Sequence, residues 1–526
     1  MAEFIAILDF GSQYTQLIAR RVRENKVYCE ILRHDTPSSE LKSLSRGAQL
    51  KGIILSGGPA GVYEEDAPRA DVEIFHLGLP VLGICYGMQL GSEVLGGRVY
   101  PSSTREFGAT EIDVVRDDAL FRGIQKRTTV WMSHGDQVKD LDPSFVTLAS
   151  TTTCPNAAVR HLPTGFLGLQ FHPEVTHTPE GKTILKNFLY QVCGCRGDWS
   201  LSKFVEEKTD ELKRQVGSSR VVCALSGGVD SSVVALLLQR AVGSQLTSVF
   251  VDNGLLREGE REQVRRTFQE SFKIDFHWVN AADRFLDRLK GVVDPEEKRK
   301  RIGHEFIEVF TDAVSREPFT GNDSHGGPAV EFLAQGTLYP DIIESHSPFG
   351  GPSATIKSHH NVGGLPSKLD FKLIEPLRYL FKDEVRAIGR DLGLPERILR
   401  RQPFPGPGLA IRVVGEVTRE RLKVLREADR IVQEEMERFE HYRDIWQSFA
   451  VLLPIQTVGV MGDRRTYEHV VALRVVESTD GMTANWVHLP KEVLSRISSR
   501  ISNEVQGVNR VVLDISSKPP STIEWE

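Results

Sequence analysis

Short apolar runs alternate along this chain with stretches whose apolar residues have helical spacing. The first run covers Phe4–Phe10, a helical stretch follows through 17–22, and further runs cover 52–55 and 80–84. Short continuous apolar runs predict strands that are buried on both faces, as in parallel sheets. Each run ends in a turn that contains glycine. Repeated units of strand, glycine turn and helix predict a doubly wound, mostly parallel sheet.

The same pattern returns after a predicted amphipathic helix at 201–215, and a proline- and glycine-rich hinge at 401–408 interrupts it. Proline cannot continue a helix, so the hinge predicts a domain boundary. Beyond it the pattern predicts a charged helix from 418 to about 439, a helix near 491–504 and strands at 457–461, 470–476 and 508–515. The predicted class is α/β, with two doubly wound domains followed by a small α+β domain; the predicted bounds are 1–196, 200–400 and 401–526.

Length and charge narrow the function classes. A chain of 526 residues is too long for one hydrophobic core. The net charge of −6 gives no support for a nucleic-acid or anionic membrane partner. The first residues lack the layout of a signal peptide, and no apolar run reaches the length of a membrane span. We therefore expect a cytoplasmic protein with no nucleic-acid or membrane partner.

Cysteine usage agrees with a reducing compartment. Six cysteines, at positions 29, 85, 154, 193, 195 and 223, are too few and too scattered for a disulfide framework. Cys193 and Cys195 form a close pair, but no second pair of cysteines or histidines has zinc-site spacing. We expect reduced thiols at both positions.

A glycine-rich loop at 225–232 lies between the apolar run 220–224 and a helical stretch at 233–240. Glycines allow close backbone approach, and the N–H groups and dipole of a helix start attract anions, of which phosphate is the most obvious. The loop is not a Walker A sequence, because no lysine follows its glycines. Asp230, a carboxylate among phosphates, predicts a bridging Mg²⁺ ion.

Cys85 follows the run 80–84 on a tight turn before a helix, which is a position typical of a nucleophile. A lone internal cysteine is more often a small buried hydrophobe. His172 and Glu174, however, are two positions apart on an extended segment, so their side chains point to the same side. Backbone N–H groups at Gly57 and Gly58 could hold an oxyanion. These parts together indicate thiol-based acyl transfer.

Three motifs resemble the class I glutamine amidotransferases: SGGP at 56–59, GICYGMQ at 83–89 and QFHPE at 170–174. The resemblance implies that Cys85 attacks the glutamine carboxamide, His172 transfers the proton and Glu174 orients His172. It places the oxyanion at the amides of Gly58 and Tyr86 and the glutamine substrate at Gln89 and His134. His134 could equally be a structural histidine. The glutaminases that use an N-terminal cysteine are excluded, because residue 2 is alanine.

The loop SGGVDSS at 226–232 resembles the N-type ATP pyrophosphatases, which split ATP into AMP and pyrophosphate. The resemblance implies that ATP packs its adenine on Val251 and that Lys382, otherwise a typical solvated lysine, stabilises the departing pyrophosphate. It assigns the ATP phosphates to Leu225, Ser226, Gly227, Gly228, Val229, Asp230, Ser231 and Ser232.

The stretches 294–303, 334–345 and 356–366 and the terminal KPPSTIEWE together resemble the glutamine-hydrolysing GMP synthetase family. The family aminates xanthosine 5′-monophosphate (XMP) to GMP through an adenylyl intermediate, with Mg²⁺ and ATP. The stretch 356–366 is a basic loop with glycines near its end and predicts a mobile lid over phosphates. The resemblance implies that Lys357 of this lid contacts the ATP phosphates. It implies XMP contacts from Arg299, Asp341, Lys518, Thr522, Ile523 and Glu524. The loops at 319–330 and 347–354 depart from the family pattern by being longer or more irregular.

The basic cluster that contains Arg299 would otherwise be interpreted as a solvated charge run. The C-terminal strands need more cover than one helix provides, so we expect a homodimer through this domain, as the family resemblance also implies. Two rival classes are another glutamine-fed ATP pyrophosphatase, such as an NAD or asparagine synthetase, and a protein that kept the folds but lost catalysis. The terminal motif disfavours the first, and the intact set Cys85, His172, Glu174, Ser226, Asp230 and Lys382 disfavours the second.

Overall fold

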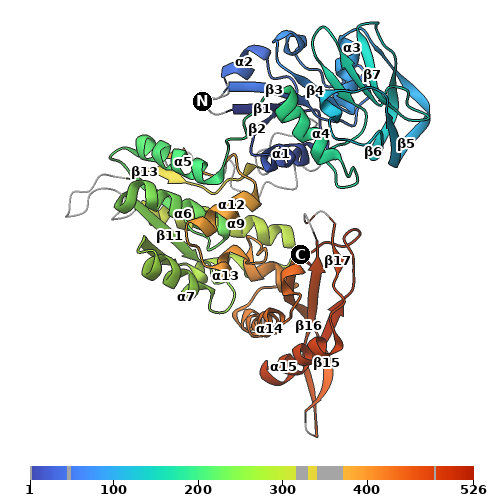
Figure 1. Ribbon diagram of the computed structural model, residues 1–526. Helices are drawn as coiled ribbons and strands as arrows, with labels where there is room; N and C mark the ends of the chain where they lie inside the picture. The colour runs from blue at the N-terminus through green and yellow to red at the C-terminus, as the bar shows by residue number, and fades with distance from the viewer. Residues whose placement is uncertain are drawn as a thin grey trace. The chain divides into compact units, whose positions relative to one another are not determined.

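A computed structural model describes residues 3–43, 49–315, 330–339, 371–461, 463–478, 481 and 483–526. The chain divides into two compact units, and the division falls between Phe204 and Val205 (Figure 1). Within the described residues no helix is long and apolar enough to cross a membrane. All six cysteines are buried and form no disulfide, as predicted from their spacing.

The first unit is built on a nine-stranded sheet in the order β2-β1-β3-β4-β9-β8-β7-β5-β6. The strands from β2 to β9 in this order are parallel, and the rest pair antiparallel. The bounds are β1 (Glu3–Asp9), β2 (Tyr28–Arg33), β3 (Gln49–Leu55), β4 (Val81–Ile84), β5 (Arg98–Val114), β6 (Arg127–Asp140), β7 (Phe145–Ser150), β8 (Ala158–His161) and β9 (Leu167–Leu169). The parallel half was predicted from the apolar runs; the antiparallel half was not, because its alternating polar residues lack that signal.

The first three helices of the first unit connect its parallel strands, as in doubly wound folds, and the others follow β4, β5 and β9. They are α1 (Thr15–Glu24), α2 (Ser38–Ser43), η1 (Val72–His76), α3 (Tyr86–Val94), η2 (Ala119–Phe121), α4 (Gly181–Asn187) and η3 (Phe188–Val192). Every residue of β4 is buried, and α3 begins two residues after the strand ends. The intervening residue is Cys85, at the carboxyl end of a central strand.

The second unit contains a five-stranded, fully parallel sheet in the order β12-β11-β10-β13-β14. Its strands are β10 (Arg220–Ala224), β11 (Leu246–Asp252), β12 (Asp275–Asn280), β13 (Val330–Ala334) and β14 (Lys372–Ile374). Its helices are α5 (Leu201–Val216), α6 (Val229–Val242), η4 (Gly243–Gln245), α7 (Glu260–Arg265), η5 (Arg266–Ser271), α8 (Ala282–Leu289), α9 (Pro295–Val314), α12 (Lys382–Asp391), α13 (Glu396–Leu399) and η6 (Gly408–Arg412). The start of α9 is specified by sequence, because the Asp294 side chain accepts from the Glu297 amide and Pro295 follows at the first helical position.

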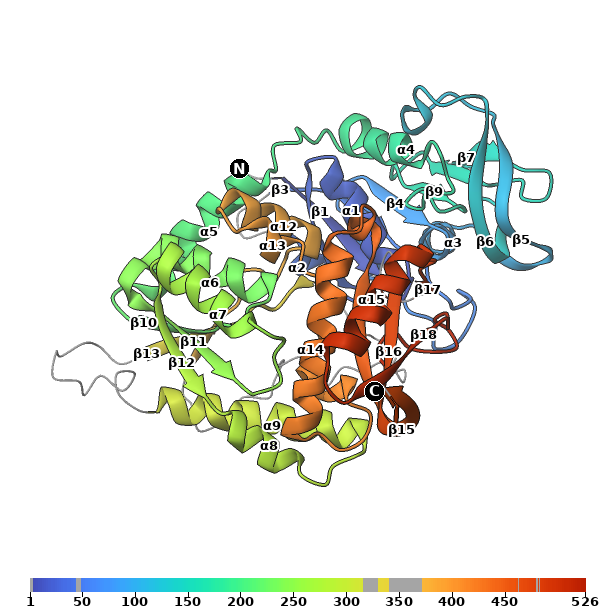
Figure 2. The same cartoon turned by 90° about the horizontal axis from the view of Figure 1, so that it is seen from below.

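A second sheet follows in the C-terminal part of this unit. Its strands are β15 (Gln447–Met461), β16 (Arg464–Glu477), β17 (Asn485–Trp486) and β18 (Val508–Asp514). β15 and β17 pair antiparallel with β16, and β18 runs parallel to it. Two helices, α14 (Arg419–Glu437) and α15 (Lys491–Glu504), lie side by side against this sheet, and η7 (Tyr442–Asp444) precedes β15 (Figure 2). The α/β class and the small α+β part are thus confirmed.

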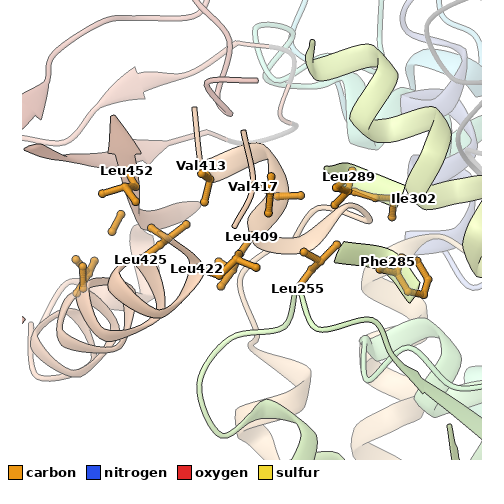
Figure 3. Packing of buried hydrophobic residues seen from close by; sticks show 14 of the residues in the cluster. Leu255, Phe285, Leu289, Ile302, Leu409, Val413, Val417, Leu422, Leu425 and Leu452 are labelled. Atoms are coloured by element: carbon orange, nitrogen blue, oxygen red, sulfur yellow. The ribbon is translucent and has the colours of Figure 1, made fainter. Parts of the chain in front are cut away.

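One hydrophobic core joins the parallel sheet to the C-terminal helices. Phe285 and Ile302 from α8 and α9 belong to the same buried cluster as Leu409 from η6 and Leu425 from α14 (Figure 3). The hinge at 401–408 runs between them. At its end the Leu409 amide donates to the Leu255 carbonyl at 2.8 Å. Gly408 has a φ of 62°, and a Cβ there would lie 2.4 Å from the Leu255 oxygen, so only glycine fits. The three-domain division stays a prediction.

Candidate functional site

Cys85 occupies a strained turn between β4 and α3. Its φ of 51° and ψ of −106° lie outside the regions that non-glycine residues ordinarily adopt. The turn is held because the Cys85 amide donates to the Leu169 carbonyl at 2.7 Å and the Gly87 amide donates to the Ser56 carbonyl at 3.1 Å. A Cβ at Gly87 would come within 2.5 Å of the Leu55 oxygen. Strain at one cysteine in an otherwise regular sheet is typical of a nucleophile held for reaction.

His172 and Glu174 form a buried pair beside this turn. Nδ1 of His172 lies 2.7 Å from Oε1 of Glu174. Burial alone would lower the pKa of His172, but the Glu174 carboxylate and a hydrogen bond with Cys85 outweigh it and raise the pKa well above its usual range. The ring packs against Tyr14, edge-on with 5.1 Å between the ring centroids, and the His172 backbone is held because its amide donates to the Trp131 carbonyl. The three side chains, predicted from two separate motifs, therefore lie together.

The predicted oxyanion groups lie next to the cysteine. A Cβ at Gly57 would lie 3.1 Å from Cε1 of His172, and one at Gly58 would lie 2.7 Å from the Phe10 oxygen. A side chain at Gly58 would therefore collide with the backbone, and one at Gly57 would crowd the His172 ring. Tyr86 is buried, its hydroxyl donates to the Pro68 carbonyl at 2.6 Å, and burial raises its pKa to about 12. The tyrosine side chain is therefore structural, which leaves only its backbone amide for an oxyanion.

The two predicted glutamine contacts are both bonded to protein groups. Nε2 of Gln89 donates to the Asp136 carbonyl at 3.0 Å. His134 is buried, with Nδ1 2.9 Å from the Asp136 carbonyl and Nε2 3.1 Å from the Glu106 carboxylate. These contacts favour the structural interpretation of His134. Gln170 is closer to the chemistry, because its Nε2 lies 3.8 Å from the Cys85 sulfur.

In the second unit, the glycine-rich loop at 225–232, the predicted ATP-phosphate site and hereafter the phosphate loop, joins β10 to α6. The Leu225 amide donates to the Val249 carbonyl at 2.9 Å, which fixes the entry of the loop, and Gly227 has a φ of 76°. Ser226 and Ser231 hydroxyls lie 3.0 Å apart, and the Ser232 hydroxyl donates to the Gly228 carbonyl. The loop is therefore a compact hydroxyl-lined turn at a helix N-terminus, a suitable cradle for phosphate.

Asp230 lies on the same loop, in the first turn of α6. A Cβ at Gly336 would lie 3.4 Å from the Asp230 backbone, so the segment after β13 packs against the loop.

Two further predicted ATP contacts lie on neighbouring elements. Val251 is buried at the end of the neighbouring strand β11. Lys382 is the exposed first residue of α12, a helix that packs on α6 through Gly389 and Val233. Asp341 and Lys357 lie outside the described residues, as do nearly all of the irregular loops at 319–330 and 347–354 and the whole stretch 356–366.

The C-terminal tail and Arg299 meet, although they are more than two hundred residues apart in the sequence. An Nη of Arg299 donates to the carbonyl of Glu526. Ile523 packs against the cluster of Phe449 and its neighbours, and Lys518 donates from Nζ to the Gly481 carbonyl at 2.8 Å. The Thr522 hydroxyl donates to the Glu524 carbonyl. The tail is thus an ordered part of the second unit.

Three fully buried cations hold the tail, and sequence reasoning missed all of them. Arg412 makes a bidentate pair with Glu524 at 2.8 and 3.0 Å. Arg474 donates to the carbonyls of residues 516, 522 and 523. Lys298 pairs with the Glu526 side chain, and burial lowers the pKa of this lysine. Lysine and arginine are almost never fully buried without partners, and the tail supplies partners to all three residues.

Three protein-family models match separate parts of the chain, and full-length relatives match nearly all of it. Residues 6–192 match the class-I glutamine amidotransferase model, 200–297 match NAD synthase, and 434–525 match the GMP synthase C terminal domain. A GMP synthase [glutamine-hydrolyzing] from Caldanaerobacter subterraneus subsp. tengcongensis is 56% identical and covers 100% of this chain and 99% of its own length. The one from Thermomicrobium roseum is 57% identical, with 99% and 96% covered. Among solved structures, a putative GMP synthase subunit from Thermoplasma acidophilum is 32% identical, covers 37% of this chain and 95% of its own, and has a TM-score of 0.32.

The fold, the cysteine turn and the phosphate loop define a glutamine amidotransferase joined to an ATP pyrophosphatase. Full-length identity above one half then specifies the kind of ligase. The chain belongs to the family of glutamine-hydrolysing GMP synthases.

Proposed function

We propose that this enzyme aminates XMP to GMP in two linked reactions, with glutamine hydrolysis in the first unit and XMP adenylylation in the second. The observation that carries the proposal is the joint presence of the assembled Cys85–His172–Glu174 set and of the ordered phosphate loop and tail. Each alone is compatible with several ligases. Their combination requires both ammonia release and pyrophosphate cleavage.

In the first unit, the Cys85 sulfur attacks the carboxamide carbon of glutamine. The developing oxyanion is held by the amides of Gly58 and Tyr86, and the imidazolium of His172 donates its proton to the departing ammonia. Water then attacks the thioester carbonyl, with neutral His172 accepting its proton, and releases glutamate. The buried Glu174 carboxylate fixes the tautomer of His172 and stabilises its charged form, in agreement with the raised pKa.

In the second unit, we propose that the phosphates of ATP lie on residues 225–232, with adenine on Val251 and Lys382 near the pyrophosphate. O2 of the xanthine ring attacks the α-phosphorus, and pyrophosphate leaves. Ammonia then attacks C2 and AMP leaves, which yields GMP. The loop offers only oxygen donors, the Asp230 carboxylate and serine hydroxyls, and this hard donor set fits Mg²⁺, which would neutralise phosphate charge.

For XMP we propose a site formed by Lys518, Thr522, Ile523 and Glu524 together with Arg299. The support is that all are in one ordered segment or contact it. Arg299 reaches the end of the tail, where its positive charge would attract a bound phosphate. Asp341 and Lys357 remain further proposed contacts from the resemblance alone. The absence of nucleic-acid partners and a cytoplasmic location complete the proposal.

We further propose a homodimer in which a second copy covers the long hairpin of β15 and β16 (Figure 1). Val458 and Tyr467 are register partners on this hairpin, and Val460 shares their face. All three are exposed, Val460 by 73%. A contiguous exposed apolar face favours association. Light scattering of Val460→Asp should show monomers where the parent shows dimers; a dimer in both would contradict the proposal.

The deciding experiment is an assay of the purified protein with XMP, Mg²⁺-ATP and either glutamine or ammonium. We expect GMP, AMP and pyrophosphate from both nitrogen sources. Formation of ADP, or no product from ammonium, would contradict the proposed reaction. The metal requirement is checked in the same assay by removing Mg²⁺ with a chelator, which should stop GMP formation from glutamine and from ammonium.

A further inference from the structure

Three arginines surround the ring of Phe404 in the hinge. Their guanidinium carbons lie 4.9 Å (Arg257), 5.4 Å (Arg401) and 5.2 Å (Arg412) from the ring centroid. All three distances are within the range of cation–π attraction. Three positive charges around one ring repel one another, so the arrangement requires compensation nearby.

Each arginine has its own carboxylate. Arg257 pairs with Asp429 at 3.0 Å, Arg401 pairs with Glu260 at 2.5 Å, and Arg412 pairs with Glu524 at 2.8 Å. Burial lowers the pKa of Arg257, and the Asp429 carboxylate opposes the shift. We call Phe404 and these six charged residues the Phe404 cluster. Its charges are balanced, and removal of any one leaves a partner uncompensated in a largely buried place.

The cluster ends on the two proposed substrate sites. At one end, an Nη of Arg401 donates to the carbonyl of Gly227 in the phosphate loop at 3.1 Å. At the other end, Arg412 holds Glu524 of the tail in a bidentate pair. Nε2 of Gln447 donates both to the Pro403 carbonyl and to Glu524, each at 2.8 Å, and so ties the hinge itself to the tail. Phe404 of the hinge therefore packs against Arg401, which contacts the phosphate loop, and against Arg412, which contacts the tail.

We propose that Phe404 is a positioning residue for the adenylylation step: its cluster sets the phosphate loop and the tail relative to each other, so that O2 of XMP faces the α-phosphorus of ATP. The proposal rests on the substrate placement given above. Attack in line on phosphorus tolerates little misalignment, and an error of about 1 Å in such a step costs roughly 100-fold in rate. Loss of the ring should therefore reduce the rate of the chemical step more than the binding of either substrate alone.

The test compares Phe404→Leu with Phe404→Tyr in the ammonium-driven reaction. The leucine keeps an apolar side chain but removes the π face, whereas the tyrosine keeps both. We expect kcat to fall about 10- to 100-fold in Phe404→Leu and to stay within about 3-fold of the parent in Phe404→Tyr. Dissociation constants for ATP and XMP, each measured alone by calorimetry, should change less than about 3-fold in both. Equal kcat values for the parent and Phe404→Leu would overturn the proposal.

A second pair of variants tests the cluster without touching its ring. Glu260→Gln removes the partner of Arg401, and Glu262→Gln is the matched control on the same helix, because Glu262 pairs with exposed arginines outside the cluster. We expect kcat to fall about tenfold in the first and to stay unchanged in the second. Equal kcat values for these two would contradict the proposal even if Phe404→Leu failed to fold.

Failure of the underlying substrate placement would look different. Lys518→Ala should weaken XMP binding alone. If it does not, XMP is bound elsewhere and the placement fails; if it does, and the Phe404 and Glu260 variants behave like the parent, only the positioning role is refuted.

Discussion

The two proposed reaction sites of this chain are built in opposite ways. In the first unit, the reacting groups are side chains that already contact one another, and His172 is paired with Glu174 and hydrogen-bonded to Cys85. In the second unit, the site consists of a backbone loop, an ordered tail and buried cations that hold the tail. Among the described residues of the second unit, no group of side chains is arranged like Cys85, His172 and Glu174.

The difference follows from the chemistry. Acyl transfer needs a protein nucleophile and a proton carrier, so the protein must supply both in register. Phosphoryl and adenylyl transfer need little from side chains beyond positioning and charge stabilisation, because the substrates bring the reacting atoms. We therefore expect that removal of one side chain from the first unit strongly reduces GMP formation from glutamine only. In the second unit, such a removal should reduce GMP formation from glutamine and from ammonium alike, by amounts that differ from residue to residue.

The largest effect is expected from Cys85→Ala. Loss of the sulfur removes the covalent step, so glutamine-driven GMP formation should fall by about 10⁴-fold or more, while ammonium-driven formation should stay within about 2-fold. GMP production from each nitrogen source measures both. Cys29→Ala, a buried thiol elsewhere in the same unit, is the control and should keep both activities. Equal loss from ammonium would refute the division of labour.

Asp230→Asn should affect both nitrogen sources alike. Loss of the carboxylate from the phosphate loop removes the proposed metal ligand, so GMP formation from glutamine and from ammonium should each fall by about 10²- to 10³-fold. Asp210→Asn, an exposed carboxylate on α5, is the control. A loss confined to glutamine would place Asp230 outside the adenylylation site.

Glu174→Gln should lower glutamine hydrolysis by about 10²-fold, since His172 loses its orienting carboxylate. It should also change stability in a pH-dependent way. The folded-state pKa of His172 is raised above its ordinary value. The stability that this pair contributes is therefore fully present below the unfolded-state pKa of about 6.5 and is lost as pH rises through the folded-state pKa.

The measurement is thermal unfolding of both proteins between about pH 6 and pH 10. The variant should be less stable by about 3 kcal/mol at the acidic end, and the gap should shrink toward the alkaline end. A gap that stays constant over this range would mean that His172 is not charged in the folded protein.

The smallest effect is expected from Lys518→Ala. Loss of one cation from a multi-residue site should raise the KM for XMP by about tenfold and leave the KM for ATP unchanged. Lys491→Ala, an exposed lysine at the start of α15, should change neither. Steady-state kinetics with ammonium as nitrogen source separates the two. A change in the KM for ATP alone would show that the tail is at the other substrate.

Much of the first site could be predicted from sequence because its residues are in short motifs next to apolar runs. Cys85 follows β4, and His172 and Glu174 share one extended segment, so local pattern and elementary geometry bring them close to their observed places. His134 shows the limit. A histidine in a motif has the same sequence signal whether it faces substrate or, as here, Glu106 and a carbonyl.

In the second unit, prediction reached the loop and the tail but not what holds them. Lys298, Arg412 and Arg474 resemble ordinary surface cations in the sequence, because burial of a charge is decided by partners that are distant along the chain. The Glu524 and Glu526 side chains that pair with two of them are more than one hundred residues away. The antiparallel half of the first sheet was missed for a similar reason, since half-buried strands carry a weaker pattern than fully buried ones.

The sequence by itself determined the α/β class, the strand-to-helix turns that present Cys85 and the phosphate loop, and the family. These depend on local periodicity and on motifs that are contiguous in the chain. Only the tertiary structure decided that η6 and α9 hold the tail and that one phenyl ring in the hinge joins the loop to it. Contacts of that kind are made between charges and rings whose sequence separation carries no signal, and their energy appears only when folding removes them from water.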